Sequence, residues 1–144
     1  MILADVNPII HAYNTGFPNH TAARDWWEGA LNGTEAVGLA WVTVLGFVRI
    51  MTHPRILQRP MTVEAAVEIV HSWLELSVVE IVHPGDRHAE IWTRLLREAG
   101  TAGNLTTDAH LAALAIEHRA RLASTDTDFA RFQGLRWFNP LARP

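Results

Sequence analysis

The chain is predicted to form a single α/β domain over residues 1–144, with a parallel sheet of four to five strands and helices on both faces. Short, wholly apolar runs alternate along the sequence with longer segments of helical periodicity. Apolar runs of this kind are typical of strands that are buried on both faces, as in parallel sheets. The alternation of such strands with helices favours the same architecture. A chain of 144 residues also suits one domain with its own core.

Each element is predicted from its own local pattern. The apolar runs predict strands at 1–5, 36–41, 78–82 and 121–125, and a short last strand at 135–138. Helical spacing predicts helices from residue 8 onward and at 20–31, 44–52, 63–76, 86–100 and 106–120, with a helical turn at 128–132. Short polar side chains that accept hydrogen bonds from free amides predict helix N-caps at Asn7, Asn19, Thr43 and Thr62. Gly100 is the predicted stop of its helix.

The composition excludes several classes of protein. All 12 cationic residues are arginine, and without lysine the chain is neither a P-loop protein nor a phosphoryl-aspartate enzyme that needs one. The absence of cysteine excludes disulfides and thiolate zinc sites. The net charge of −3 gives no overall attraction to nucleic acid, so RNA binding would need a local arginine patch.

The apolar runs and the N-terminal residues predict a cytoplasmic protein. No apolar run approaches the roughly 18 residues that a membrane span requires. The N-terminal run has neither a charged leader nor a cleavage site that follows an apolar stretch. We therefore expect the mature chain to begin at Met1, with the cytoplasm as its compartment and no membrane partner.

Aspartates fall where predicted strands end or helices begin. Asp5 closes the first strand, Asp126 and Asp128 follow the fourth, and Asp108 lies in the first turn of a helix. Taken alone, each is more often a helix cap than a ligand. Ligands of parallel sheets, however, bind beyond the carboxyl ends of the strands, where these segments are expected to meet.

Carboxylates gathered at one edge predict a metal site. Two of them repel by about 4 kcal/mol at about 4 Å with an effective dielectric near 20. A bound cation or protonation of some of the acids relieves this repulsion. Oxygen ligands without cysteine suit a hard divalent ion such as Mg²⁺ or Mn²⁺, which activates water and neutralises charge on a phosphodiester.

Three blocks of the sequence carry a family resemblance. They read MILADVNPIIHAYN, WVTVLGFVRIMTHPRI and GNLTTDAHLAALAIEHRARLASTDTDFARFQGLRWFNPL. In content, order and spacing they resemble the PIN-domain ribonuclease toxins, the VapC type of toxin–antitoxin module. The resemblance implies a PIN-like fold and an acidic pocket that binds Mg²⁺ or Mn²⁺ and cuts single-stranded RNA. It also implies a homodimer that is held by a cognate VapB-type antitoxin.

The resemblance extends to individual positions. By position it implies that the catalytic acids are Asp5, Asp108, Asp126 and Asp128, of which Asp5, Asp108 and Asp126 are the expected metal ligands, Asp126 directly or through water. Polar residues expected to support the pocket are Asn7, Thr43, Asn104 and Thr125.

One position departs from the family pattern. Many of these toxins carry a glutamate three residues after a hydroxyl residue on the helix that follows the second strand. Here Thr43 is followed at that distance by Gly46. The gap keeps open an alternative function, a catalytically weak or silent PIN-like module that binds RNA or an antitoxin. If the site is active, Asp128 is the candidate to complete it.

Other candidate residues keep two interpretations. Arg49, Arg55 and Arg59 are a possible RNA or antitoxin contact, or a solvated helix end. The tryptophans are expected to pack in the core rather than to stack on bases; they are Trp26, Trp27, Trp41, Trp73, Trp92 and Trp137. Weaker alternatives are a zinc site at His11, His110 and His118, a hydrolase triad of Ser124 with His110 and Asp108, and a Mg²⁺ nuclease acting on DNA flaps. His110 and His118 lie two helical turns apart, and no nucleophile elbow surrounds Ser124.

Overall fold

A five-stranded, wholly parallel sheet forms the centre of the molecule. The computed structural model describes residues 1–143. Its strands are β1 (Ile2–Ala4), β2 (Val37–Leu39), β3 (Val79–Ile81), β4 (Arg121–Ala123) and β5 (Arg136–Phe138). They lie in the order β3-β2-β1-β4-β5, with β1 paired to β2 on one side and to β4 on the other. The predicted parallel sheet is confirmed, and each strand is shorter than the apolar run that predicted it.

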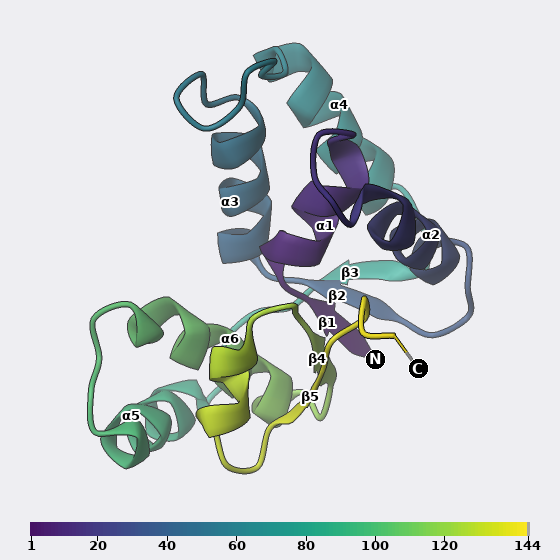
Figure 1. Cartoon of the computed structure of the whole chain (residues 1–144). Coiled ribbons are helices and arrows are strands. Elements are labelled where there is room, and N and C mark those ends of the chain that lie inside the picture. Colours follow the sequence, from purple (N-terminus) through teal and green to yellow (C-terminus); the bar gives the residue numbers. More distant parts are fainter. Residues whose placement is uncertain (144) are drawn as a thin grey trace.

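Helices cover both faces of this sheet (Figure 1). They are α1 (Val6–Tyr13), α2 (His20–Leu31), α3 (Trp41–Met51), α4 (Val63–Leu74), α5 (His88–Ala99) and α6 (Leu105–Glu117), and a short 3₁₀ helix, η1, spans Thr127–Arg131. Helices α1 to α4 gather on one side, and α5 and α6 pack together on the other. Within residues 1–143, no helix combines the length and apolarity that crossing a membrane requires.

Two hydrophobic cores follow from the alternation of side chains along the strands. Leu3 packs into the core under α5 and α6, whereas its neighbour Ala4 packs into the core under α1 to α4. In the second core, Trp27 and Trp73 are almost fully buried and meet Phe47 and Tyr13 in a cluster of aromatic rings. Trp27 and Trp73 therefore pack in the core as predicted, whereas Trp41 is 49% exposed. The other tryptophans are partly buried and pack against one of the two cores; they are Trp26, Trp92 and Trp137.

The predicted N-caps of two helices were wrong. Helix α1 is capped by Asp5, whose Oδ1 accepts a hydrogen bond from the Val6 amide at 2.7 Å, and Asn7 lies exposed within the helix. Helix α3 begins at Trp41, because β2 ends at Leu39 rather than continuing into the tryptophan. The predicted cap Thr43 is thereby buried inside the first turn of α3.

Of the remaining cap predictions, those at Thr62 and Gly100 are confirmed and the one at Asn19 is not. Thr62 caps α4, with its Oγ1 accepting from the Ala65 amide at 3.1 Å. Gly100 ends α5 with a left-handed backbone (φ 72°), a conformation that costs glycine little. Asn19 precedes α2 but makes no capping hydrogen bond with its side chain.

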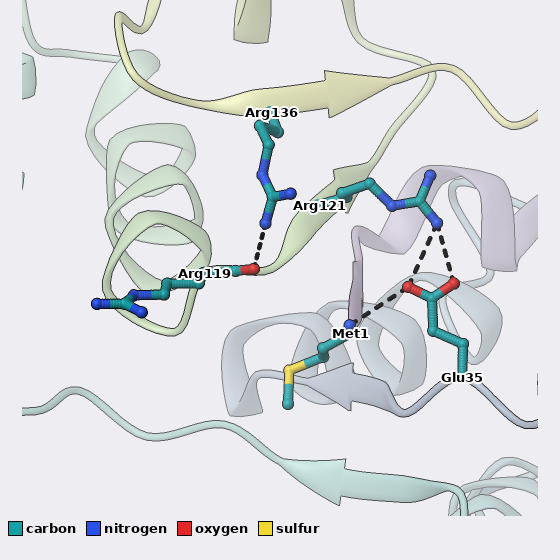
Figure 2. A network of polar contacts seen from close by, with 5 residues as sticks. All are labelled: Met1, Glu35, Arg119, Arg121 and Arg136. Carbon is teal, nitrogen blue, oxygen red and sulfur yellow. Dashed lines mark hydrogen bonds and ion pairs between the residues drawn. The ribbon is translucent and has the colours of Figure 1, made fainter.

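A polar network joins the amino ends of the central strands (Figure 2). Glu35, just before β2, accepts the Met1 ammonium at 3.3 Å and the Arg121 guanidinium at 3.0 Å. Arg121 also lies over the ring of Phe138, and Arg136 donates to the backbone carbonyl of Arg119. The Arg121–Glu35 pair is well exposed and stabilises the fold little, so burial of the two cores supplies most of the stability. The predicted aspartates lie at the opposite, carboxyl edge of the sheet.

Candidate metal centre

The parallel register places the predicted aspartates at one edge of the sheet. Ala4 at the end of β1 lies opposite Ala123 at the end of β4, and the amide of Asp5 donates to the Ala123 carbonyl at 3.0 Å. Asp5 therefore stands beside the segment that leads from β4 to Asp126 and η1. Asp108 lies in the first turn of α6, and Asp128 lies in η1.

Three carboxylates converge there. One carboxylate oxygen from each of Asp108, Asp126 and Asp128 lies within 4.8 Å of the other two. Hard cations take oxygen ligands at about 2.0–2.6 Å, so ligands on opposite sides of one ion lie about 4–5 Å apart. The donor set and its spacing thus fit one hard divalent cation. Among residues 1–143, it is the one group of three or more acids or histidines that lie close enough to share a metal ion.

Asp5 occupies a different position from the other three. Its side chain is 6% exposed, and both of its oxygens are already bonded, Oδ1 to the Val6 amide and Oδ2 to the Ser124 hydroxyl, each at 2.7 Å. The structure does not bring Asp5 into the group within 4.8 Å. Each carboxylate oxygen can accept more than one partner, so direct ligation of a metal by Asp5 stays a prediction.

Ser124 connects Asp5 to Asp126. Its side chain is fully buried, and its Oγ donates to Asp5 while accepting a hydrogen bond from the Asp126 amide at 3.0 Å. The Asp126 side chain in turn accepts from the Asp128 amide at 2.9 Å. From the sequence, Ser124 is a candidate only as a nucleophile, and its bonds to Asp5 and Asp126 are not predicted. The sequence feature that could have indicated this role is a serine between the end of a buried strand and the acid Asp126. A hydroxyl at that place can donate a hydrogen bond to a carboxylate on the neighbouring strand end.

The charges of the site are poorly compensated. Burial, followed by the charges of Asp126, Asp5 and Asp128, raises the pKa of Asp108 to about 6. Burial also raises the pKa of Asp5, against the lowering effect of its bonds to Ser124 and Val6. The nearest cation to the cluster is Arg131, 3.7 Å from Asp128 in a pair that is about half exposed. A divalent ion would relieve this mutual repulsion.

The predicted supporting residues surround the site to different degrees. Thr43 is buried and its Oγ1 donates to the carbonyl of Ala4 at 3.3 Å, next to Asp5. Thr125 is half-buried between Ser124 and Asp126, whereas Asn7 and Asn104 are exposed. The side chain of Asn104 makes no capping bond to α6.

Gly46 faces the start of α1 rather than open solvent. A Cβ atom placed on Gly46 would lie 3.5 Å from Val6 Cγ2, an ordinary van der Waals contact. A side chain at this position would thus begin beside the residue that follows Asp5. Position 46 is therefore next to the acidic site, but glycine contributes no carboxylate to it.

The predicted arginine contact lies outside the group of acids. Arg49 is exposed on α3, and Arg55 is exposed in the connection to α4. Arg59 lines a separate cavity of about 670 Å³, together with residues 13–17 and 56–58, Met51 and Met61. A role of these arginines in RNA or antitoxin binding stays a prediction.

His11, His110 and His118 do not form the zinc site considered as a weaker alternative. His110 shares a hydrogen bond with His88, Nδ1 to Nε2 at 2.9 Å, and His118 pairs through Nε2 with the His83 carbonyl at 2.8 Å. His11 stacks on Phe17 at the other end of α1. The three histidines therefore lie in separate environments.

Comparison with known proteins gives consistent matches over the whole chain. The family model described as "PIN domain" matches residues 2–135. Ribonuclease VapC37 of Mycobacterium tuberculosis is 46% identical over 142 residues, 99% of each chain. Ribonuclease VapC33 of the same species is 43% identical over 141 residues, which is 98% of this chain and 99% of the relative. The solved VapBC-1 of nontypeable Haemophilus influenzae superposes with a TM-score of 0.69, 15% identity and coverage of 99% and 100%.

Replacing Ser124 by alanine tests the bond that fixes Asp5. Ser124→Ala removes a buried donor to a carboxylate, so we expect the free energy of unfolding to fall by about 1–3 kcal/mol. The pKa of Asp5 should rise further, because a bond that lowers it is lost. Ser72→Ala is the matched control at an exposed serine on α4 and should change stability by less than about 0.5 kcal/mol. Equal stability of the two variants in urea denaturation, with an unchanged Asp5 titration by NMR, would contradict the role of Ser124.

The raised pKa of Asp108 predicts how stability depends on pH without metal. Between the unfolded value of 3.8 and the folded value of about 6, the folded protein holds a proton that the unfolded chain has lost. Stability should therefore fall as pH rises through this window, and the full cost persists above it. With a chelator present, Asp108→Asn should gain stability relative to wild type as pH rises from 5 to 7. A difference that stays constant over this range in denaturant titrations would show that Asp108 has an ordinary pKa.

Proposed function

The chain belongs to the PIN-domain family, and we propose that it is the toxin of a type II toxin–antitoxin module, an endoribonuclease that depends on Mg²⁺ or Mn²⁺. The observation that carries the proposal is the group formed by Asp108, Asp126 and Asp128, beside the buried Asp5, in a chain similar over its full length to named ribonucleases. We also propose that it acts on RNA in the cytoplasm.

The donor chemistry supports the choice of ion. Asp108, Asp126 and Asp128 offer oxygen ligands alone, and the sequence has no cysteine. Such ligands suit hard ions like Mg²⁺ and Mn²⁺. These residues would hold the ion, with Asp5 close enough to add to the negative field, since its charge contributes to the raised pKa of Asp108.

Hydrolysis of a phosphodiester sets the roles of the protein groups. A bound divalent ion supplies charge neutralisation at the scissile phosphate and acidifies water. Asp126, held by the Ser124–Asp126 turn, would orient the attacking water for in-line attack. Asp128 is held next to Asp126 through its amide and would take the place of the missing acid at Gly46. Ser124 and Thr43 would fix the ends of β1 and β4 around Asp5.

A second function is supported by Gly46. Without an acid at this position, the chain would act as a catalytically weak or silent module that binds RNA or an antitoxin. Both functions predict binding, so metal-dependent cleavage discriminates between them.

Two protein partners belong to the proposal. One is a VapB-type antitoxin, for which Arg49, Arg55 and Arg59 offer exposed positive charge. The other is a second copy of the chain. Trp41 and Leu45, one turn apart on α3, are 49% and 65% exposed, and burial of such side chains in a homodimer is favourable.

Loss of one carboxylate tests the catalytic proposal. Asp108→Asn keeps the shape of the side chain, removes a ligand charge and should lower the rate of RNA cleavage with Mn²⁺ by at least about a hundredfold, since a bound ion contributes several kcal/mol to the transition state. Asp25→Asn, at an exposed aspartate on α2, is the control and should cut at the wild-type rate. Rates are measured on a panel of oligoribonucleotides with and without chelator. Cleavage by Asp108→Asn at the control rate would refute this site, and inactivity of the wild type on total RNA would favour the silent module.

Charge placed on α3 tests the homodimer. Leu45→Glu should convert a dimer to a monomer in size-exclusion chromatography with light scattering, because an unpaired charge in an apolar contact is costly. Leu76→Glu, at a 37% exposed leucine just after α4, is the matched control and should leave the mass unchanged. A dimeric Leu45→Glu variant would place the interface elsewhere.

A further inference from the structure

A second cavity lies beside the acidic site and has a different chemistry. It has a volume of about 260 Å³ and is lined by Val42, His88, Trp92, Thr106, Thr107 and His110. The lining has no arginine and no acid, and its two histidines are bonded to each other, so this cavity offers a phosphate or a metal ion few charged partners. It is smaller than the roughly 300–1,000 Å³ of sites for drug-sized ligands, which favours one planar ring over a whole nucleotide.

The walls of the cavity are aromatic and held in place. The rings of His88 and His110 meet edge to face, with centroids 4.8 Å apart, and share a hydrogen bond of 2.9 Å. This bond needs one nitrogen as an acceptor, so at least one ring is neutral. The indole nitrogen of Trp92 donates to the backbone carbonyl of Thr106 at 3.2 Å, which ties α5 to the start of α6. The hydroxyl residues Thr106 and Thr107 are exposed at the cavity.

The cavity and the acids share two short segments of chain. Thr107 directly precedes Asp108 on α6. Val42 directly precedes Thr43, whose hydroxyl bonds to the carbonyl of Ala4 next to Asp5. The first turns of α3 and α6 therefore border both places. A strand of RNA whose phosphate lies at the acids would bring a neighbouring base to this cavity.

We propose that this cavity is a subsite that receives one unpaired base of the RNA next to the scissile phosphate. The inference rests on the proposed ribonuclease function. Trp92 and the His88–His110 pair present aromatic surfaces and Val42 an aliphatic one, against which a base packs. Thr106 and Thr107 present hydroxyls to its polar edge. The subsite selects single-stranded RNA, because a base in a duplex is not free to enter it.

The test combines removal of the base with closure of the cavity. Thr106→Tyr adds a ring from an exposed lining position and retains the backbone carbonyl that Trp92 uses. Thr101→Tyr makes the same chemical change at an exposed position outside the cavity and is the matched control. Substrates are an oligoribonucleotide that the protein cuts and versions with an abasic residue at each position around the cut. Trp92→Leu is a second variant that removes the aromatic wall.

We expect the abasic residue to lower kcat/KM only when the cavity is open and its aromatic wall is intact. At one position, the abasic residue should lower kcat/KM roughly tenfold for wild type and for Thr101→Tyr, the effect of one base–aromatic contact. For Thr106→Tyr and Trp92→Leu, the same abasic substrate should be cut within about twofold of the intact one. An abasic penalty that is equal in wild type and Thr106→Tyr, or no penalty at any position, would overturn the subsite.

A parallel binding measurement separates this inference from the proposed function. Asp108→Asn protein with diamagnetic Mg²⁺ is titrated with the same oligoribonucleotides and followed by NMR at the Trp92 indole N–H. A shift that disappears with the abasic substrate supports the subsite even if cleavage is absent. Binding without a Trp92 response overturns the subsite and leaves the ribonuclease function standing. Variants that alter only the affinity for an antitoxin would also overturn it and assign the cavity to a protein partner.

Discussion

The buried bond between Ser124 and Asp5 is the interaction on which the site depends. Asp5 follows β1 and Ser124 follows β4, and these neighbouring strands end at the same level of the sheet. The hydroxyl donates to Asp5 and accepts the amide of Asp126, so one small side chain sets the positions of two acids. Asp126 then holds the amide of Asp128, and η1 presents that third acid beside Asp108. A chain of hydrogen bonds thus runs from the buried Asp5 through Ser124 and Asp126 to Asp128, which is partly exposed to solvent.

The same arrangement concentrates negative charge that the protein does not neutralise. Three carboxylates within 4.8 Å of one another, with the buried Asp5 near them, repel one another and reduce the stability of the fold. The raised pKa of Asp108 expresses the cost of this arrangement. Conflicts between local stability and charge are expected where a site is built for a ligand, and a divalent cation bound by these acids would relieve their repulsion.

The sequence predicted the framework better than the contacts. The apolar runs predicted all five strands, and the rule for strand ends placed Asp5, Asp108, Asp126 and Asp128 in one region, because both depend on local pattern and on parallel topology. The roles of Ser124 and Thr43 depend on bonds to residues more than 35 positions away, to Asp5 and Ala4, which local pattern does not encode. The cap at Asn7 failed because the strand-end acid Asp5 took the first free amide of α1. The cavity next to the acids is formed by three helices and had no signal in any one of them.

The central claim is that the acids at this edge of the sheet hold one hard divalent cation. The most direct measurement is the anomalous scattering of crystals grown with Mn²⁺ near pH 7.5, with Asp108→Asn crystals for comparison. The account predicts an anomalous peak within about 2.5 Å of oxygens from Asp108, Asp126 and Asp128, and a weakened or absent peak in the variant. Wild-type crystals at saturating Mn²⁺ with no peak among these residues, or with the ion bound elsewhere, would contradict it.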